Sequence, residues 1–403
     1  MRAPITSPLP FARVWGWVVF VALLFLLNFM ARSALSPVLV DIERDLQAGH
    51  AQATSLLFMQ GLGFALSQAA TGFLAGRIPP VRILQVSMIS SGLCLLGMLW
   101  VRDIQEARGL FLLFGGCAGL YFPAAMATLG SLVRPADWGK AVGIHELAPN
   151  LGFILIPLLA QGALHLTHWR GFFACLGAAT CLLGLAFLRY GQGGRETTAA
   201  PSLHGSAEIL RNPAAWALTL LLIVAMSGEF SVFSVLPLFL VNENGFAPAS
   251  ANGILSLTRI ATPLAVLLGG WLADRRTPLP TLRVCLVLHT LALLLLNAQG
   301  TTMLAAAGLQ AMTIAVAFPV LFKAISGCFA LDKQPILFSL TMPLAALTSN
   351  GIMPWFFGLC GQYLSFRTGF MALAVLSALS VLCLPLLRPR AGQAKPRHRG
   401  CPV

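Results

Sequence analysis

Long apolar stretches recur from one end of this 403-residue chain to the other, and they restrict its fold more than any other feature. A helix that crosses a bilayer needs about 20 mainly apolar residues. We predict twelve such helices, at about 14–38, 52–76, 83–101, 109–133, 140–165, 170–189, 213–241, 249–273, 281–298, 302–326, 335–360 and 367–387. Only 10% of the residues are charged, against roughly 25% in soluble domains. The sequence therefore predicts an all-α polytopic membrane protein.

Lysine and arginine are distributed unevenly between the predicted loops. Of the 26 basic residues, eighteen fall in alternate loops on one side and five on the other, and three lie inside the spans. The positive-inside rule then places both termini in the cytoplasm of a multi-pass plasma-membrane protein. The net charge of +13 is thus a topology signal, and we expect no nucleic-acid partner.

One polar stretch divides the chain into two parts. Residues 190–212 form the longest polar segment between spans. We predict an N-terminal six-helix bundle at 1–189, a cytoplasmic linker at 190–212, a C-terminal six-helix bundle at 213–387 and a basic cytoplasmic tail at 388–403.

The two parts carry an internal repeat. Three short motifs recur in register, 196 to 198 residues apart: 72–77 with 270–275, 122–123 with 318–319, and 169–173 with 366–370. Each pair occupies the same place on corresponding helices. Parallel six-helix repeats place a substrate site near the bilayer midplane, between the halves.

The first of these motifs resembles the loop signature of the major facilitator superfamily. Gly270, Asp274 and Arg275 keep its first part in the second half of the chain, whereas Gly72 and Arg77 keep less of it in the first. The resemblance covers the whole chain and implies twelve helices in two pseudo-symmetric bundles that work by alternating access. It also implies a gating role for these five residues.

Ionisable residues inside predicted spans are costly and indicate function. Glu229 and Arg259 each lie about two residues from the centre of a span, roughly 3 Å from the midplane at 1.5 Å per residue. We expect them to form the transport site; the alternative is a static ion pair. Arg32 could line the outer vestibule, or its side chain could extend to the membrane interface. Lys323 could gate the cytoplasmic mouth, or its side chain could likewise extend to the interface.

The pair His145-Glu146 resembles the first half of H-E-x-x-H, a zinc-binding motif, but the fifth position is Pro149. The second metal ligand is therefore missing, and no metal is expected. Pro149 cannot donate to the carbonyl of residue 145, so the helix should bend there. Asn150 lies one turn after Glu146 and extends a polar stripe. We interpret the segment as a gate or proton carrier; the alternative is a pair at the water interface.

These features together predict a secondary transporter, not an enzyme. We hypothesise that Glu146 approaches Arg259 or Lys323 when the cytoplasmic side closes, which would couple protonation to transport. The solute would be a small anionic or zwitterionic molecule. We expect a monomer in the lipid bilayer, with no cofactor and a proton gradient as the energy source. The alternatives are a proton-coupled multidrug or metabolite efflux pump, a transporter-like sensor or assembly factor, and a polytopic membrane enzyme.

Overall fold

The computed structural model describes residues 8–197, 206–330 and 333–387, and nearly all of them are helical. Eleven of the described segments are long and apolar enough to cross a membrane. The remaining predicted span, at 52–76, is the 26-residue helix α3 (His50–Ala75), which also carries Gln52, Gln60 and Gln68. The prediction of an all-α polytopic membrane protein is therefore confirmed.

The first half of the chain contains six spans. Its helices are α1 (Phe11–Ser33), α2 (Leu35–Asp45), α3, α4 (Pro80–Gly97), η1 (Met98–Trp100), α5 (Ile104–Gly119), α6 (Tyr121–Leu132), η2 (Pro135–Asp137), α7 (Trp138–His145), α8 (Leu147–Leu164) and α9 (Trp169–Tyr190). Several spans consist of two consecutive helices with a short interruption between them.

The second half repeats this pattern. Its helices are α10 (Ser206–Arg211), α11 (Pro213–Met226), η3 (Ser227–Ser231), α12 (Val232–Asn242), α13 (Pro248–Leu257), α14 (Thr262–Arg275), α15 (Pro278–Leu295), α16 (Gly300–Cys328), α17 (Gln334–Leu347), η4 (Thr348–Ile352), α18 (Met353–Tyr363), α19 (Phe366–Val381) and η5 (Leu384–Leu386). The short helix α10 lies within the predicted linker.

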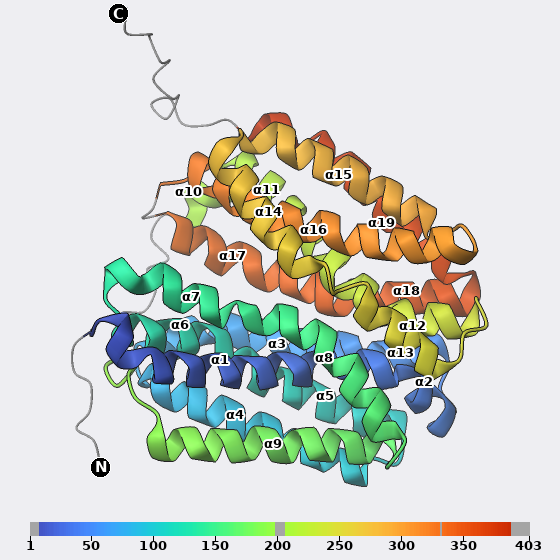
Figure 1. Cartoon of the computed structure of the whole chain (residues 1–403), viewed down its shortest axis with the longest axis horizontal. Helices are drawn as coiled ribbons and strands as arrows, with labels where there is room; N and C mark the ends of the chain where they lie inside the picture. The colour runs from blue at the N-terminus through green and yellow to red at the C-terminus, as the bar shows by residue number, and fades with distance from the viewer. Residues whose placement is uncertain (1–7, 198–205, 331–332, 388–403) are drawn as a thin grey trace, which may run out of the picture.

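The two halves form two groups of helices that lie against each other (Figure 1). Helices α1 to α9 make up one group, and α10 to α19 make up the other. The predicted domain boundaries stay a prediction, and the tail at 388–403 lies outside the described residues. We call the end of the molecule that holds Phe11, Leu132 and Arg275 the basic end, and the end that holds Asp45, Trp169 and Phe366 the opposite end.

The internal repeat appears as the same contact in both halves. At the opposite end, Asp45 accepts hydrogen bonds from Trp169 Nε1 at 3.1 Å and Arg170 Nη1 at 2.6 Å. Glu243 accepts a hydrogen bond from the backbone N of Phe366 at 2.5 Å, and its carboxylate lies 3.8 Å from Arg367 Nε. The repeated aromatic-arginine motif therefore fastens the start of the last span to the end of the first span within each half.

Prolines explain two of the interrupted spans. α7 ends at His145 and α8 begins at Leu147. Pro149, four residues after His145, has no backbone N–H to donate to the His145 carbonyl. α13 ends at Leu257 and α14 begins at Thr262, followed by Pro263, which cannot donate to the carbonyl of residue 259. The Thr262 hydroxyl donates to that carbonyl instead, at 2.7 Å. Each interruption thus follows from one missing backbone donor.

Two further spans contain π-helical turns, η3 and η4, which lie side by side. The Ser231 hydroxyl of η3 donates to the backbone carbonyl of Ser349 in η4 at 2.6 Å. A π-turn inserts one residue into an α-helix and is frequent at functional sites. The sequence reasoning did not predict these turns, because no single residue type specifies them.

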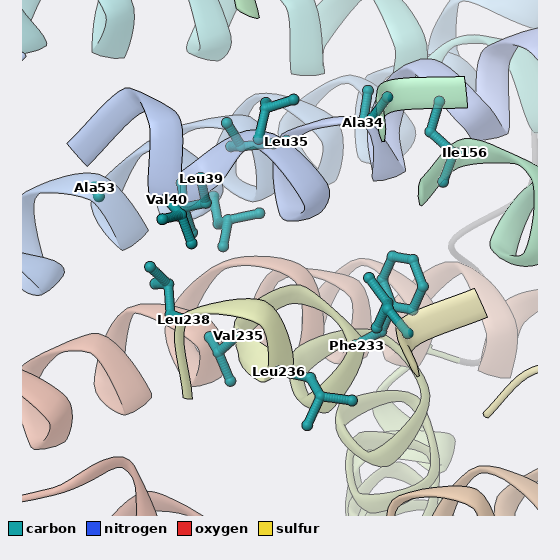
Figure 2. Close-up of a cluster of buried hydrophobic side chains, with 14 of the residues drawn as sticks. Ala34, Leu35, Leu39, Val40, Ala53, Ile156, Phe233, Val235, Leu236 and Leu238 are labelled. Carbon is teal, nitrogen blue, oxygen red and sulfur yellow. The ribbon is translucent and has the colours of Figure 1, made fainter. Parts of the chain in front are cut away.

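Among the described residues, the buried apolar cluster that joins the two halves lies at the opposite end. One buried cluster there includes Leu35 and Leu39 of the first half with Phe233 and Leu236 of the second. Figure 2 shows this cluster between the two groups of helices. Towards the basic end, the buried residues instead form two separate clusters, one within each half. The halves are therefore packed together at the opposite end and have independent cores at the basic end.

Hydrogen bonds across the same junction use backbone carbonyls. Pro237 cannot donate to the carbonyl of Phe233, and the Ser36 hydroxyl of the other half does so at 2.8 Å. Asn252 Nδ2 donates to the carbonyl of Pro37 at 3.0 Å. In a membrane, a carbonyl released by proline must be satisfied by a neighbouring group. Ser36 supplies that partner for Phe233, and both contacts hold the junction closed.

Close contact between α3 and α5 depends on glycine. A Cβ at Gly115 would lie 2.0 Å from the backbone oxygen of Gln60, whereas a Cβ at Gly109 on the same helix meets nothing within 4 Å. We expect Gly115→Ala to destabilise the protein by about 1–3 kcal/mol through overpacking. Gly109→Ala is the matched control and should be neutral or slightly stabilising, because alanine favours helix. Thermal unfolding in detergent measures both; equal midpoints would contradict the prediction.

Candidate functional site

A cavity of about 510 Å³ lies between the two halves, next to the junction at the opposite end. Its lining combines phenylalanines from both halves with a few polar side chains. The polar and charged residues that line it are Asn28, Arg32, Gln68, Glu146, Asn150, Glu229 and Asn350. Ligand sites are typically apolar pockets with a small number of placed polar groups, and this cavity has that character.

Arg32 is the cavity-lining cation. It lies in the last turn of α1, just before the chain is interrupted at Ala34. Its guanidinium carbon lies 4.6 Å from the ring centroid of Phe64 and 5.3 Å from that of Phe29. Its Nε is buried without a hydrogen-bond partner, and no ion pair joins Arg32 to an acid in the described parts of the chain. The two rings offset part of the cost of burying the charge.

Glu229 and Arg259 form an ion pair beside the cavity. Arg259 Nη1 donates to Glu229 Oε1 at 2.6 Å, and Nη2 donates to the Glu229 backbone oxygen at 2.8 Å. Arg259 is 2% exposed and Glu229 is 13% exposed. Glu229 lies on η3, and Arg259 lies in the interruption between α13 and α14. Only Glu229 lines the cavity, and Arg259 sits behind it against Phe153, with its guanidinium carbon 4.6 Å from the ring centroid.

Glu146 lies in the interruption between α7 and α8, where its side chain is 44% exposed. Its Oε1 lies 3.1 Å from Nδ1 of His145, which is itself fully buried. The His145 ring stacks on Phe25 with centroids 4.2 Å apart, and its Nε2 lies 3.5 Å from the Tyr121 hydroxyl. Glu146 therefore reaches the cavity, whereas His145 lies behind the lining residues Glu146 and Phe25.

Pro149 and Asn150 also line the cavity, on the first turns of α8. Asn150 Nδ2 donates to the Glu146 backbone oxygen at 3.2 Å. Within the described ranges, no ion pair joins Glu146 to Arg259 or Lys323. The predicted contact belongs to a form closed at the basic end, and it stays a prediction.

Of the residues predicted to gate, Pro149 lines the cavity and the others are not among its lining residues. Lys323 is exposed on α16, next to Phe322, which does line the cavity. Arg77, Asp274 and Arg275 are exposed near the basic end, where Arg275 stacks on Trp271 with 5.1 Å between its guanidinium carbon and the ring centroid. Gly270 faces open space, and the surroundings of Gly72 lie outside what the structure describes.

The structure adds polar residues that the sequence reasoning missed. Asn28, Gln68 and Asn350 all line the cavity, and Asn350 lies on the π-turn η4. An amide carries no charge, so its presence in a span is a weaker signal of function than an ionisable side chain. The sequence carries two signals for such polar positions in the spans: amide side chains inside predicted spans, and prolines that follow embedded charges. Pro263, four residues after Arg259, is an example.

One family model matches most of this chain. The family model of the Major Facilitator Superfamily matches residues 21–305 and 218–400. The chain belongs to the Major Facilitator Superfamily, as the loop motifs and the internal repeat predicted.

Two relatives are similar to this chain in sequence. The chain is 26% identical over 260 residues to "Probable nitrate/nitrite transporter NarK2" of Mycobacterium tuberculosis, which covers 62% of this chain and 64% of that relative. It is 23% identical over 299 residues to "Nitrite extrusion protein" of Bacillus subtilis, covering 72% of each. The matched region thus spans less than two thirds of the mycobacterial relative.

Solved structures share the fold. A bacterial homologue of the human lysosomal transporter Spinster, in an inward-facing and occupied conformation, superposes with a TM-score of 0.79 at 15% identity, covering 94% of this chain and 97% of the other. The xylose transporter XylE from E. coli, in an inward open conformation, gives a TM-score of 0.74 at 13% identity, covering 94% and 98%. At these identities the likeness concerns the fold alone.

Proposed function

We propose that this protein is a secondary transporter that moves a small anion across the membrane by alternating access. The observation that carries the proposal is Arg32, a cation that lines the central cavity without a carboxylate partner in the described residues. A charge inside a bilayer costs at least about 2.5–3.5 kcal/mol when unpaired. A bound anion would offset that cost, so the cavity favours an anionic solute.

The other cavity charges support this assignment. Glu229 is neutralised by Arg259 at 2.6 Å, and Glu146 is held by His145. Neither carboxylate forms an ion pair with Arg32. Two relatives whose names refer to nitrate or nitrite agree with a small anion as solute.

The packing supports alternating access. The halves share one apolar core at the opposite end and have separate cores at the basic end. Closing the basic end would bring the facing surfaces of the two halves together there, while the shared cluster at the opposite end separates. We place the basic end in the cytoplasm on the positive-inside rule, and on this proposal the described form faces inward.

The lining of the cavity favours a second candidate, efflux of amphipathic compounds. Eight phenylalanines line it, and aromatic side chains accommodate large apolar groups. The side chains concerned are those of Phe25, Phe29, Phe64, Phe122, Phe153, Phe230, Phe318 and Phe322. We rank this candidate second, because an amphipathic cation gains nothing from Arg32.

A flux assay in proteoliposomes separates the two candidates. We expect uptake of a small anion such as nitrite or formate that is saturable and inhibited by other small anions. Lipophilic cations should neither be carried nor compete. Transport of such cations without any anion flux would contradict the proposal and favour the efflux pump.

Proton coupling would use Glu146. Its carboxylate is half exposed at the edge of the cavity, and the buried His145 ring lies within hydrogen-bond distance. Glu146→Gln keeps the size of the side chain and one oxygen but removes the titrating group. We expect this variant to bind the anion, but its rate of proton-driven uptake should be at least about tenfold lower, in line with the contribution of a positioned proton acceptor. Counterflow without a gradient should persist; full proton-driven uptake would refute the role.

A further inference from the structure

A second pocket, on the outer flank of the first half, lies at the basic end between α1 and α9. It has a volume of about 900 Å³. Three arginines line it, Arg13, Arg189 and Arg195, together with the aromatic residues Trp15 and Tyr190. None of its described lining residues is acidic. The pocket shares no lining residue with the central cavity, so transport does not account for its charge.

The arginines are brought together by structure and not by sequence. Arg13 lies in the first turn of α1 and Arg189 in the last turn of α9. Arg195 follows a turn in which Gly193 and Gly194 have φ angles of 84° and 58°, a region that favours glycine. Gly194 N donates to Ser131 Oγ at 2.6 Å, and Val81 N donates to the Gly194 oxygen at 3.0 Å. The turn is thus pinned to the bundle and carries Arg195 back to the pocket.

The walls of the pocket are those of a membrane-facing surface. Trp15 is 58% exposed and Tyr190 is 66% exposed, and the Arg189 guanidinium carbon lies 5.7 Å from the Tyr190 ring centroid. Gly16 leaves the floor open, since a Cβ there would meet nothing within 4 Å. Tryptophan and tyrosine with arginine at helix ends mark the headgroup level of a bilayer.

A largely apolar groove adjoins the pocket and runs along α4, with Gln85 and Ser90 as its uncharged polar lining residues. It has a volume of about 400 Å³ and shares Leu188 with the pocket. Val86, Ile89 and Leu93 of α4 form its wall, and Arg82 lies at its basic end. A cluster of cations that opens onto an apolar groove matches a molecule with an anionic head and a hydrocarbon chain.

We propose that this pocket is a binding site for an anionic phospholipid, with the headgroup phosphate between Arg13, Arg189 and Arg195 and an acyl chain along the groove beside Leu188. Basic pockets between membrane helices bind anionic headgroups in this way. A free phosphate ion would satisfy the arginines but would leave the adjoining apolar groove unfilled. Binding at this site would make the contacts of α1 and of the start of the linker depend on the lipid composition of one leaflet.

Native mass spectrometry of the full-length protein in detergent tests the proposal. Titration with phosphatidylglycerol, phosphatidylcholine and inorganic phosphate gives an apparent dissociation constant for each. We expect phosphatidylglycerol to bind at least tenfold more tightly than phosphatidylcholine. Arg189→Gln and Arg195→Gln should each weaken it by about fivefold, the contribution of one basic residue near an anionic surface.

The matched control is Arg276→Gln, which removes the same charge from an exposed position beyond the end of α14, outside the pocket. Its affinity for phosphatidylglycerol should match that of the unmodified protein. An equal loss in Arg276→Gln would show a general charge effect and overturn the site. Equal affinity for inorganic phosphate and phosphatidylglycerol, or no preference between the two lipids, would also overturn it. Arg189→Lys keeps the charge and checks that any loss does not come from misfolding.

Discussion

Arg32→Gln is expected to reduce anion uptake by about 10- to 100-fold in kcat/KM, because the substitution removes a charge-assisted contact of about 1.5–3 kcal/mol. Arg32 lines the cavity between the rings of Phe29 and Phe64. Glutamine is of similar length and would leave the cavity largely unchanged in shape. The effect should therefore fall on anion affinity and not on folding.

Two further variants sharpen this measurement. Arg32→Lys keeps the charge but loses the planar fork that contacts two oxygens of an anion, so we expect an intermediate loss. Arg44→Gln is the matched control, since Arg44 lies on α2 of the same span, is exposed and does not line the cavity. Normal uptake by Arg32→Gln, or equal loss in Arg44→Gln, would exclude Arg32 as the anion-binding cation.

Removing one member of the buried ion pair Glu229–Arg259 should have the largest effect on the free energy of unfolding. Glu229→Ala leaves the Arg259 guanidinium buried without its carboxylate, and removal of one partner of a buried pair costs about 3–5 kcal/mol. The double variant Glu229→Leu with Arg259→Leu should recover most of this loss, because it leaves no uncompensated charge. The free energy of unfolding in detergent measures both.

Transport by the double variant distinguishes a functional pair from a static one. If Glu229 and Arg259 take part in transport, the double variant folds but does not carry the anion. Full transport would instead show that the pair serves stability alone. Glu208→Gln provides a control for loss of an ion pair: the exposed pair of Glu208 with Lys333 should contribute about 1 kcal/mol or less.

The sequence alone determined where the chain crosses the membrane. Each predicted span overlaps an observed helix or helix pair, because hydrocarbon thickness fixes the length of apolar sequence that a span requires. The repeat of 169–173 at 366–370 was likewise visible in the sequence, whereas the equivalent contacts of these residues with Asp45 and Glu243 came from the structure. Family membership followed from the same local patterns.

The sequence also located the interruption at Glu146 through Pro149, because a missing backbone donor is a local property. It also singled out Glu229 and Arg259 as a possible pair, because both lie near the bilayer midplane in their predicted spans. It could not show that Arg259 lies behind Glu229 and away from the cavity, because depth along a helix does not give the direction in which a side chain points.

Only the tertiary structure decided which side chains share a space. Arg32, Asn350 and Glu146 lie on three different spans, and their meeting at one cavity depends on how the two halves are packed. The arginines at positions 13, 189 and 195 are likewise far apart in sequence and come together through a glycine turn. Apolar length and backbone donors are properties of a segment and can be read from it, whereas a binding site is set by contacts between segments.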